Sequence, residues 1–156
     1  MMHPSVSALW QHYRQLHPDA PPGLPPVEHF CDNQAEADQC AQLVVQGIKQ
    51  ATSSALVAYR IAQEALPQAG HLVIITSWAG EAKAIIRTHT VTLCRFGDVS
   101  ARFAWLEGEG DRSLASWRAA HRAFWTRTLA GTGQVVDDDL QVVCEMFDTV
   151  LIAPPA

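Results

Sequence analysis

The sequence predicts an α+β domain built on a small mixed or closed sheet. Two runs rich in β-branched residues, His71 to Ser77 and Ala82 to Leu93, are typical of strands. Stretches with helical spacing of apolar residues lie before and after these runs. Because helices and strands do not alternate regularly, the pattern does not indicate a parallel sheet of repeated βαβ units. Closure into a barrel would remove the exposed edges that short strands otherwise leave.

The N-terminal part predicts a helix followed by a linker. Apolar residues between Ser5 and His17 recur at helical spacing, which indicates an amphipathic helix. Residues 18–26 are rich in proline, which fixes φ and lacks a backbone donor, so they form neither a helix nor an inner strand. We therefore expect an N-terminal helix and proline-rich linker over residues 1–27 and the main domain over residues 28–153.

The remaining elements follow from capping and periodicity. Asn33, with Glu36 three positions later, forms a capping-box pattern that starts a helix. Gly47 is placed to help end that helix. Three further segments complete the prediction: a short helix over 55–66, a longer helix over 113–129 and a final strand over 140–151.

Length and composition restrict the class of protein. The chain of 156 residues, with 48% hydrophobic and 17% charged residues, fits one globular domain. No apolar run approaches the roughly 18 residues of a membrane span, and no secretory signal precedes the first helix. The four cysteines are scattered without a C-x-x-C pair, which favours reduced thiols in a cytoplasmic protein.

Charge is distributed unevenly along the chain. The formal net charge is −5, which argues against a nucleic-acid partner. However, ten of the 11 Lys and Arg residues lie between Lys49 and Arg127, with only six of the 16 acidic residues. A basic middle between acidic ends could form a phosphate-binding face, although segregation in sequence need not survive folding.

A lysine lies close to three hydroxyl residues in the string Gly47-Ile-Lys49-Gln-Ala-Thr52-Ser53-Ser54. Residues three apart become neighbours only on a helical or 3₁₀ turn, so a functional pair of Lys49 and Thr52 predicts a tight turn here. A lysine whose pKa falls from about 10.4 to about 7 or 8 could take a proton from a hydroxyl or from water. A solvated lysine beside a capping threonine fits the same spacing.

A second string, Glu107-Gly-Glu109-Gly-Asp111, places carboxylates among glycines. Alternating glycines could let a ligand approach the main chain. Asp111 is placed to cap the helix that follows. Glu107 follows an apolar stretch and is expected to point inward. The string lacks the ligand positions of a calcium loop.

The predicted helix after this string carries aromatic residues at helical spacing, which usually pack in the core. Arg118 or Arg122 on it could meet a phosphate, and an exposed tryptophan could stack on a base. The seven histidines form no H-x-x-x-H pair. We therefore expect no metal site and no cofactor.

Several strings, taken in their order along the chain, resemble the ASCH domain, a PUA-like family, in its longer bacterial type. The resemblance covers about residues 28 to 151. The strings are Phe30-Cys-Asp32, Gly47-x-Lys49-x-x-Thr52-x-Ser54, Phe103-Ala-x-x-Glu107-Gly-Glu-Gly-Asp111-x-Ser113-Leu114-x-x-Trp117-Arg118-x-x-His121 and Val142-Val-x-Glu145-x-Phe147. It implies a small mixed β-barrel with surrounding helices, and a cleft for single-stranded RNA or a modified pyrimidine nucleoside.

The resemblance also implies catalytic residues. Small bacterial relatives that hydrolyse acetylated cytidine use a lysine, a threonine and a glutamate, which fall on Lys49, Thr52 and Glu107. In that scheme Thr52 is the nucleophile, Lys49 its base, and Glu107 holds or relays a proton. Longer relatives are associated with RNA cleavage. The residues expected to bind the substrate are Ser53, Ser54, Glu109 and Arg118.

Two positions depart from the small amidohydrolases. The small amidohydrolases carry an arginine where this chain has Ser54, and they lack the glycine-rich insertion around Glu109. The prediction is therefore a hydrolase, either a ribonuclease or an amidohydrolase, that acts on RNA or an acylated cytidine. A non-catalytic RNA-binding module is the alternative. No membrane partner is expected, and a homodimer is compatible with the sequence.

Overall fold

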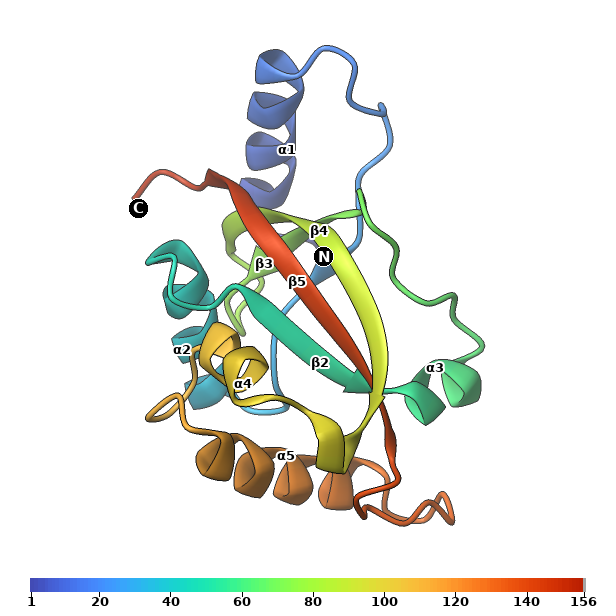
Figure 1. Cartoon of the computed structure of the whole chain (residues 1–156). Coiled ribbons are helices and arrows are strands. Elements are labelled where there is room, and N and C mark those ends of the chain that lie inside the picture. The colour runs from blue at the N-terminus through green and yellow to red at the C-terminus, as the bar shows by residue number, and fades with distance from the viewer. Residues whose placement is uncertain (156) are drawn as a thin grey trace. The chain divides into compact units, whose positions relative to one another are not determined.

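The computed structural model describes residues 1–155, in which helices and strands follow one another in mixed order (Figure 1). A short 3₁₀ helix, η1 (Phe96–Asp98), joins the fourth strand to the fourth α-helix. The α-helices are α1 (Pro4–Leu16), α2 (Gln34–Val45), α3 (Leu56–Ala62), α4 (Ala101–Glu107) and α5 (Leu114–Thr128). The strands are β1 (Val27–Glu28), β2 (Ala51–Ala55), β3 (Leu72–Thr76), β4 (Ala82–Arg95) and β5 (Gln141–Ile152). No helix within residues 1–155 is both long and apolar enough to cross a membrane.

The strands form one mixed sheet with the order β1-β3-β4-β5-β2. The short β1 pairs parallel to β3, whereas β3 pairs antiparallel to β4 and β2 antiparallel to β5. This arrangement confirms the predicted α+β class. Because β1 and β2 stand at the two ends of the order, the sheet of the described residues is open, and any barrel it forms is loose.

The chain divides into two compact units, and the long strands β4 and β5 each contribute to both. Unit 1 consists of Met1–Ile48, Gly70–Arg87 and Asp148–Ala156. Unit 2 consists of Lys49–Ala69 and Thr88–Phe147.

In unit 1, the predicted N-terminal helix is confirmed as α1, and it packs on strands of its own chain. His3 caps the helix by accepting a hydrogen bond from the backbone of Ser5, and a proline follows at the first helical position. The buried face of α1 contacts strand residues in an apolar cluster, which stabilises the unit by about 25 cal/mol per Å² buried. The buried members of this cluster are Val6, Leu9, Trp10, Tyr13, Ile74, Ala82 and Ile85.

In unit 2, one face of the sheet packs against α4 and α5 (Figure 1). In the register of β2 and β5, Ala51 lies opposite Met146 and Ser53 opposite Cys144. Side chains alternate along a strand, so Ser53 shares the helix-covered face with the buried Ala51. The members of this core are Ala51, Ala55, Phe96, Val99, Phe103, Ala104, Trp117, Trp125, Leu129, Leu140, Val142 and Cys144.

The structure corrects two local predictions. The tight turn expected between Lys49 and Thr52 is wrong, because the chain enters β2 at Ala51 and pairs with β5 along the whole strand. Long-range pairing therefore overrides the local signal from Gly47. The helix predicted over 55–66 exists but is shorter, since Gln63 adopts a left-handed conformation with φ of 55° after α3.

Candidate active site in unit 2

Lys49 stands directly before β2, where backbone hydrogen bonds fix the chain. The Gln50 amide donates to the Leu106 carbonyl at the end of α4 (2.7 Å), and the Phe147 amide of β5 donates to the Gln50 carbonyl (3.0 Å). The Lys49 side chain is only 1% exposed. An amine so deeply buried requires partners, because an isolated buried charge is very costly.

Those partners come from the end of α4 and the loop after it. The Lys49 ammonium lies 3.3 Å from Oε1 of Glu107 and 2.8 Å from Oε2 of Glu109. It also lies 3.4 Å from the backbone carbonyl of Glu107. Glu107 is the last residue of α4, and Gly108 ends the helix with φ of 75°. One cation therefore meets two carboxylates and a helix-terminal carbonyl, which carries negative partial charge.

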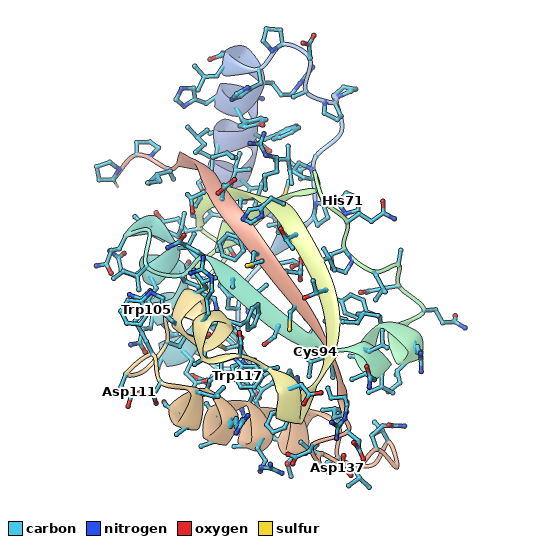
Figure 2. All side chains as sticks on the ribbon, viewed as in Figure 1. His71, Cys94, Trp105, Asp111, Trp117 and Asp137 are labelled. Carbon is cyan, nitrogen blue, oxygen red and sulfur yellow. The ribbon has the colours of Figure 1, made fainter. Side chains whose placement is uncertain are left out.

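The second oxygen of Glu107 gathers donors from β2 and α5. Oε2 accepts a hydrogen bond from the Ser53 hydroxyl (2.7 Å) and another from the indole N–H of Trp117. Figure 2 shows Trp117 between α5 and α4. Burial alone would raise the pKa of Glu107, but the charge of Lys49 and the hydrogen bonds outweigh it and hold that pKa far below its usual value. Glu107 is therefore an ionised carboxylate, oriented by Lys49 and by donors from β2 and α5.

His121 on α5 completes the cluster. Its Nδ1 lies 2.8 Å from the Trp117 carbonyl, and its Nε2 lies 3.5 Å from Oε2 of Glu107. Each ring nitrogen thus faces an acceptor, which favours the doubly protonated ring. Burial lowers the pKa of His121, but the hydrogen bond to Glu107 and its charge outweigh burial and raise that pKa.

The loop between α4 and α5 holds Glu109 by its backbone. The amide of Arg112 donates to the carbonyl of Glu109 (3.0 Å), and the Arg112 side chain donates to the Trp105 carbonyl (3.0 Å). The Arg112 guanidinium also stacks on the Trp105 ring, 3.5 Å from its centroid. Gly110 has φ of 59°, and a Cβ there would lie 2.9 Å from the Ser116 hydroxyl. Residues 108–112 therefore form an ordered turn.

The predicted site residues fall into two groups. Lys49, Ser53, Glu107 and Glu109 come together around one amine and one carboxylate. Thr52 instead lies on the other face of β2, opposite Glu145 in the register.

Ser54 and Arg118 have other partners. The Ser54 hydroxyl accepts a hydrogen bond from Tyr59 (3.4 Å). Arg118 donates to the Gly97 carbonyl (3.0 Å), while its Nε is buried without a partner among the described residues. Neither contact brings these two predicted substrate-binding residues to the Lys49 amine.

Sequence reasoning missed His121 as a site residue and assigned Trp117 to the core. Both contribute nitrogen atoms near Glu107 while their rings stack, with centroids 4.2 Å apart. The available signal was their separation of four positions on a helix, which places two side chains on one face. That spacing does not distinguish a packed pair from a pair that orients a carboxylate.

Three of these groups also have the composition of a metal site. One oxygen each of Glu107 and Glu109 and one nitrogen of His121 lie within 4.8 Å of one another. Such nitrogen and oxygen donors suit a divalent transition metal. The Lys49 ammonium already supplies positive charge to both carboxylates. A metal would therefore have to displace or repel it.

A cavity of about 230 Å³ lies on the same face of the sheet. Leu106 of α4 and Cys144 of β5 form part of its wall, whereas none of the partners of Lys49 and Glu107 named above lines it. Burial and the neighbouring Cys94 raise the pKa of the Cys144 thiol, which makes it a poor nucleophile. The lining residues are Thr92, Cys94, Asp98, Val99, Ser100, Arg102, Phe103, Leu106, Cys144 and Met146.

The cluster belongs to a part of the chain that matches a known domain. The family model of the ASCH domain matches residues 27–151. The chain belongs to the ASCH domain family. This family is generally RNA-binding. The match confirms the predicted family and its PUA-like type of fold.

Solved structures agree with this assignment. The chain is similar to an ASCH domain from Lactobacillus crispatus JV V101, with 33% identity, 96% of each chain covered and a TM-score of 0.86. It is also similar to a protein from Enterococcus faecalis V583, with 33% identity, 96% of this chain and 90% of that chain covered and a TM-score of 0.87. No curated protein matches the chain.

Proposed function

We propose that unit 2 of this ASCH protein carries a hydrolase site for RNA or a modified pyrimidine nucleoside, centred on Lys49 and Glu107. The observation that supports it is the buried pair itself, which joins residues 58 positions apart in sequence with a serine hydroxyl on the same carboxylate. Buried ion pairs contribute little net stability, so the presence of this pair favours a functional role.

The proposed roles follow from the contacts. Glu107, whose pKa is lowered, is a weak base, so it orients Lys49 and Ser53. Lys49 transfers the proton. The resemblance gives the nucleophilic hydroxyl to Thr52, whereas the contact with Glu107 favours Ser53. Separate alanine variants of these two residues distinguish the alternatives.

For an acylated cytidine, the steps are those of amide hydrolysis. Lys49 first loses its ammonium proton to solvent. The hydroxyl oxygen then bonds to the acyl carbon while its proton passes to the neutral Lys49 amine. The carbon–nitrogen bond then breaks, and the departing nitrogen takes that proton. A water molecule repeats the attack, which releases the acid and restores the hydroxyl. On RNA, the same groups would serve as acid and base for phosphodiester cleavage.

The test compares two substrates, single-stranded RNA and acetylated cytidine, with the same purified protein. We expect turnover of at least one, and its loss in Lys49→Ala. Lys83→Ala is the matched control, because Lys83 is the other lysine of the chain and forms a partly exposed ion pair with Glu81. Lys49→Arg retains the charge and keeps the test valid if the alanine variant unfolds.

Three outcomes separate the hypotheses. Turnover that persists in both Lys49 variants would remove the proposed mechanism. Binding of RNA without turnover, with an affinity that falls steeply as salt rises, would instead indicate a non-catalytic RNA-binding module. Binding of neither substrate would reject the proposed function altogether.

A further inference from the structure

The ion pairs around Lys49 join two carboxylates and two cations. Glu107 and Glu109 contribute two negative charges, and Lys49 and protonated His121 contribute two positive charges. An anionic group that entered this cluster beside Lys49 would meet two carboxylates at close range. An uncharged group would not pay this electrostatic cost.

The two carboxylates that balance Lys49 differ in how they are held. Glu107 is buried, with 2% of its side chain exposed, and accepts hydrogen bonds from two further side chains, Ser53 and Trp117. The Glu109 side chain is 35% exposed and reaches Lys49 from a loop. Of the two, Glu109 is therefore the carboxylate that an entering group can reach from solvent.

We propose that Glu109 is a specificity residue, which neutralises Lys49 and excludes anionic groups from its surroundings, so that the group reacting at Lys49 is uncharged. This inference rests on the proposed function and narrows its substrate class. An amide on a nucleoside is such an uncharged group, whereas the phosphodiester of RNA is not. The inference therefore assigns RNA phosphates to other parts of the surface.

The loop holds Glu109 beside Lys49. The Arg112 amide fixes its backbone, and Arg112 is itself stacked on Trp105. The carboxylate that repels an entering anion is therefore held in place.

The test uses two cytidines whose N4-acyl groups have equal length and different charge, butyryl and succinyl. We expect wild-type protein to prefer the butyryl compound in kcat/KM. In Glu109→Gln, which keeps the shape of the side chain, the ratio of succinyl to butyryl should rise about tenfold, as expected for one charge removed at close range. Asp111→Asn is the matched control, because it removes an exposed carboxylate from the same loop, away from Trp117 (Figure 2).

The outcomes distinguish this inference from the function on which it rests. A ratio that rises equally in Glu109→Gln and Asp111→Asn, or in neither, would overturn the role of Glu109 alone. Cleavage of single-stranded RNA that depends on Lys49 would support the hydrolase and overturn the inference. If the acylated cytidines are not turned over, titration calorimetry measures their affinities instead, and the ratio of succinyl to butyryl affinity replaces the ratio of kcat/KM. Binding of neither cytidine nor RNA would remove both proposals.

Discussion

The apolar cluster under α1 in unit 1 contrasts with the interior of unit 2 under α4 and α5. The first is built from aliphatic and aromatic side chains such as Leu9 and Ile74. The second combines an apolar core with the buried Lys49 and Glu107. Among the described residues, the cluster under α1 is apolar, whereas the interior of unit 2 also holds ionised groups.

This difference shows how each interior serves the protein. Apolar burial stabilises in proportion to the area removed from water. A buried ion pair is stabilised by mutual attraction but loses the hydration of both charges, so its net contribution is small even though loss of one partner is severe. We infer that the cluster under α1 serves stability and that the charges of unit 2 serve chemistry.

The largest expected effect comes from leaving Glu107 without its cation. Lys49→Met keeps most of the side-chain volume but removes the charge, and we expect a loss of about 3–5 kcal/mol in the free energy of unfolding. Urea denaturation followed by circular dichroism measures it. Lys83→Met, at a surface ion pair, should change stability by about 0–1 kcal/mol.

The double variant Lys49→Met/Glu107→Gln sharpens this result. It removes both charges, so much of the stability lost in the single variant should return while activity stays absent. If the single and double variants are equally unstable, the loss reflects packing, and the two interiors would not differ in the way inferred here.

In unit 1, we expect a core substitution to lower stability while leaving activity unchanged. Leu9 is buried in the cluster under α1, and Leu9→Ala should cost about 2–4 kcal/mol through lost burial and the cavity left behind. At temperatures where the variant remains folded, the kcat of any hydrolase activity should stay within about twofold of wild type. Leu16→Ala, at an exposed position on the same helix, is the control. A large drop in kcat in folded Leu9→Ala would contradict the separation of stability from chemistry.

Much of the fold could be predicted because its signals are local. The periodic apolar face of α1 and the cap formed by Asn33 each act within a few residues, and the structure shows both. The β-branched runs likewise predicted β3 and β4. The division of the chain into 1–27 and 28–153 stays a prediction.

The site could be predicted only in part, because its contacts join residues far apart in sequence. The pair of Lys49 and Glu107 came from the resemblance, and their contact spans 58 positions. The strand pairing that places Ser53 on the inner face and Thr52 on the other is also long-range. Local spacing instead suggested a turn. The role of His121 depends on which atoms face its ring, which no sequence pattern encodes.

The smallest expected effect tests the charge of His121. His121→Phe keeps the ring that stacks on Trp117 but removes both nitrogen donors. Folding raises the pKa of His121, so its stabilisation is fully present below its ordinary pKa of about 6.5 and is lost as pH rises through the raised value. The free energy of unfolding of the wild type should therefore exceed that of the variant by about 1 kcal/mol at pH 6 and by less at pH 9.5. Urea denaturation at both pH values measures this difference, with His89→Phe at an exposed position as the control. A difference that is the same at both pH values would mean that His121 contributes through packing alone, and that Lys49 is the single cation balancing the two carboxylates.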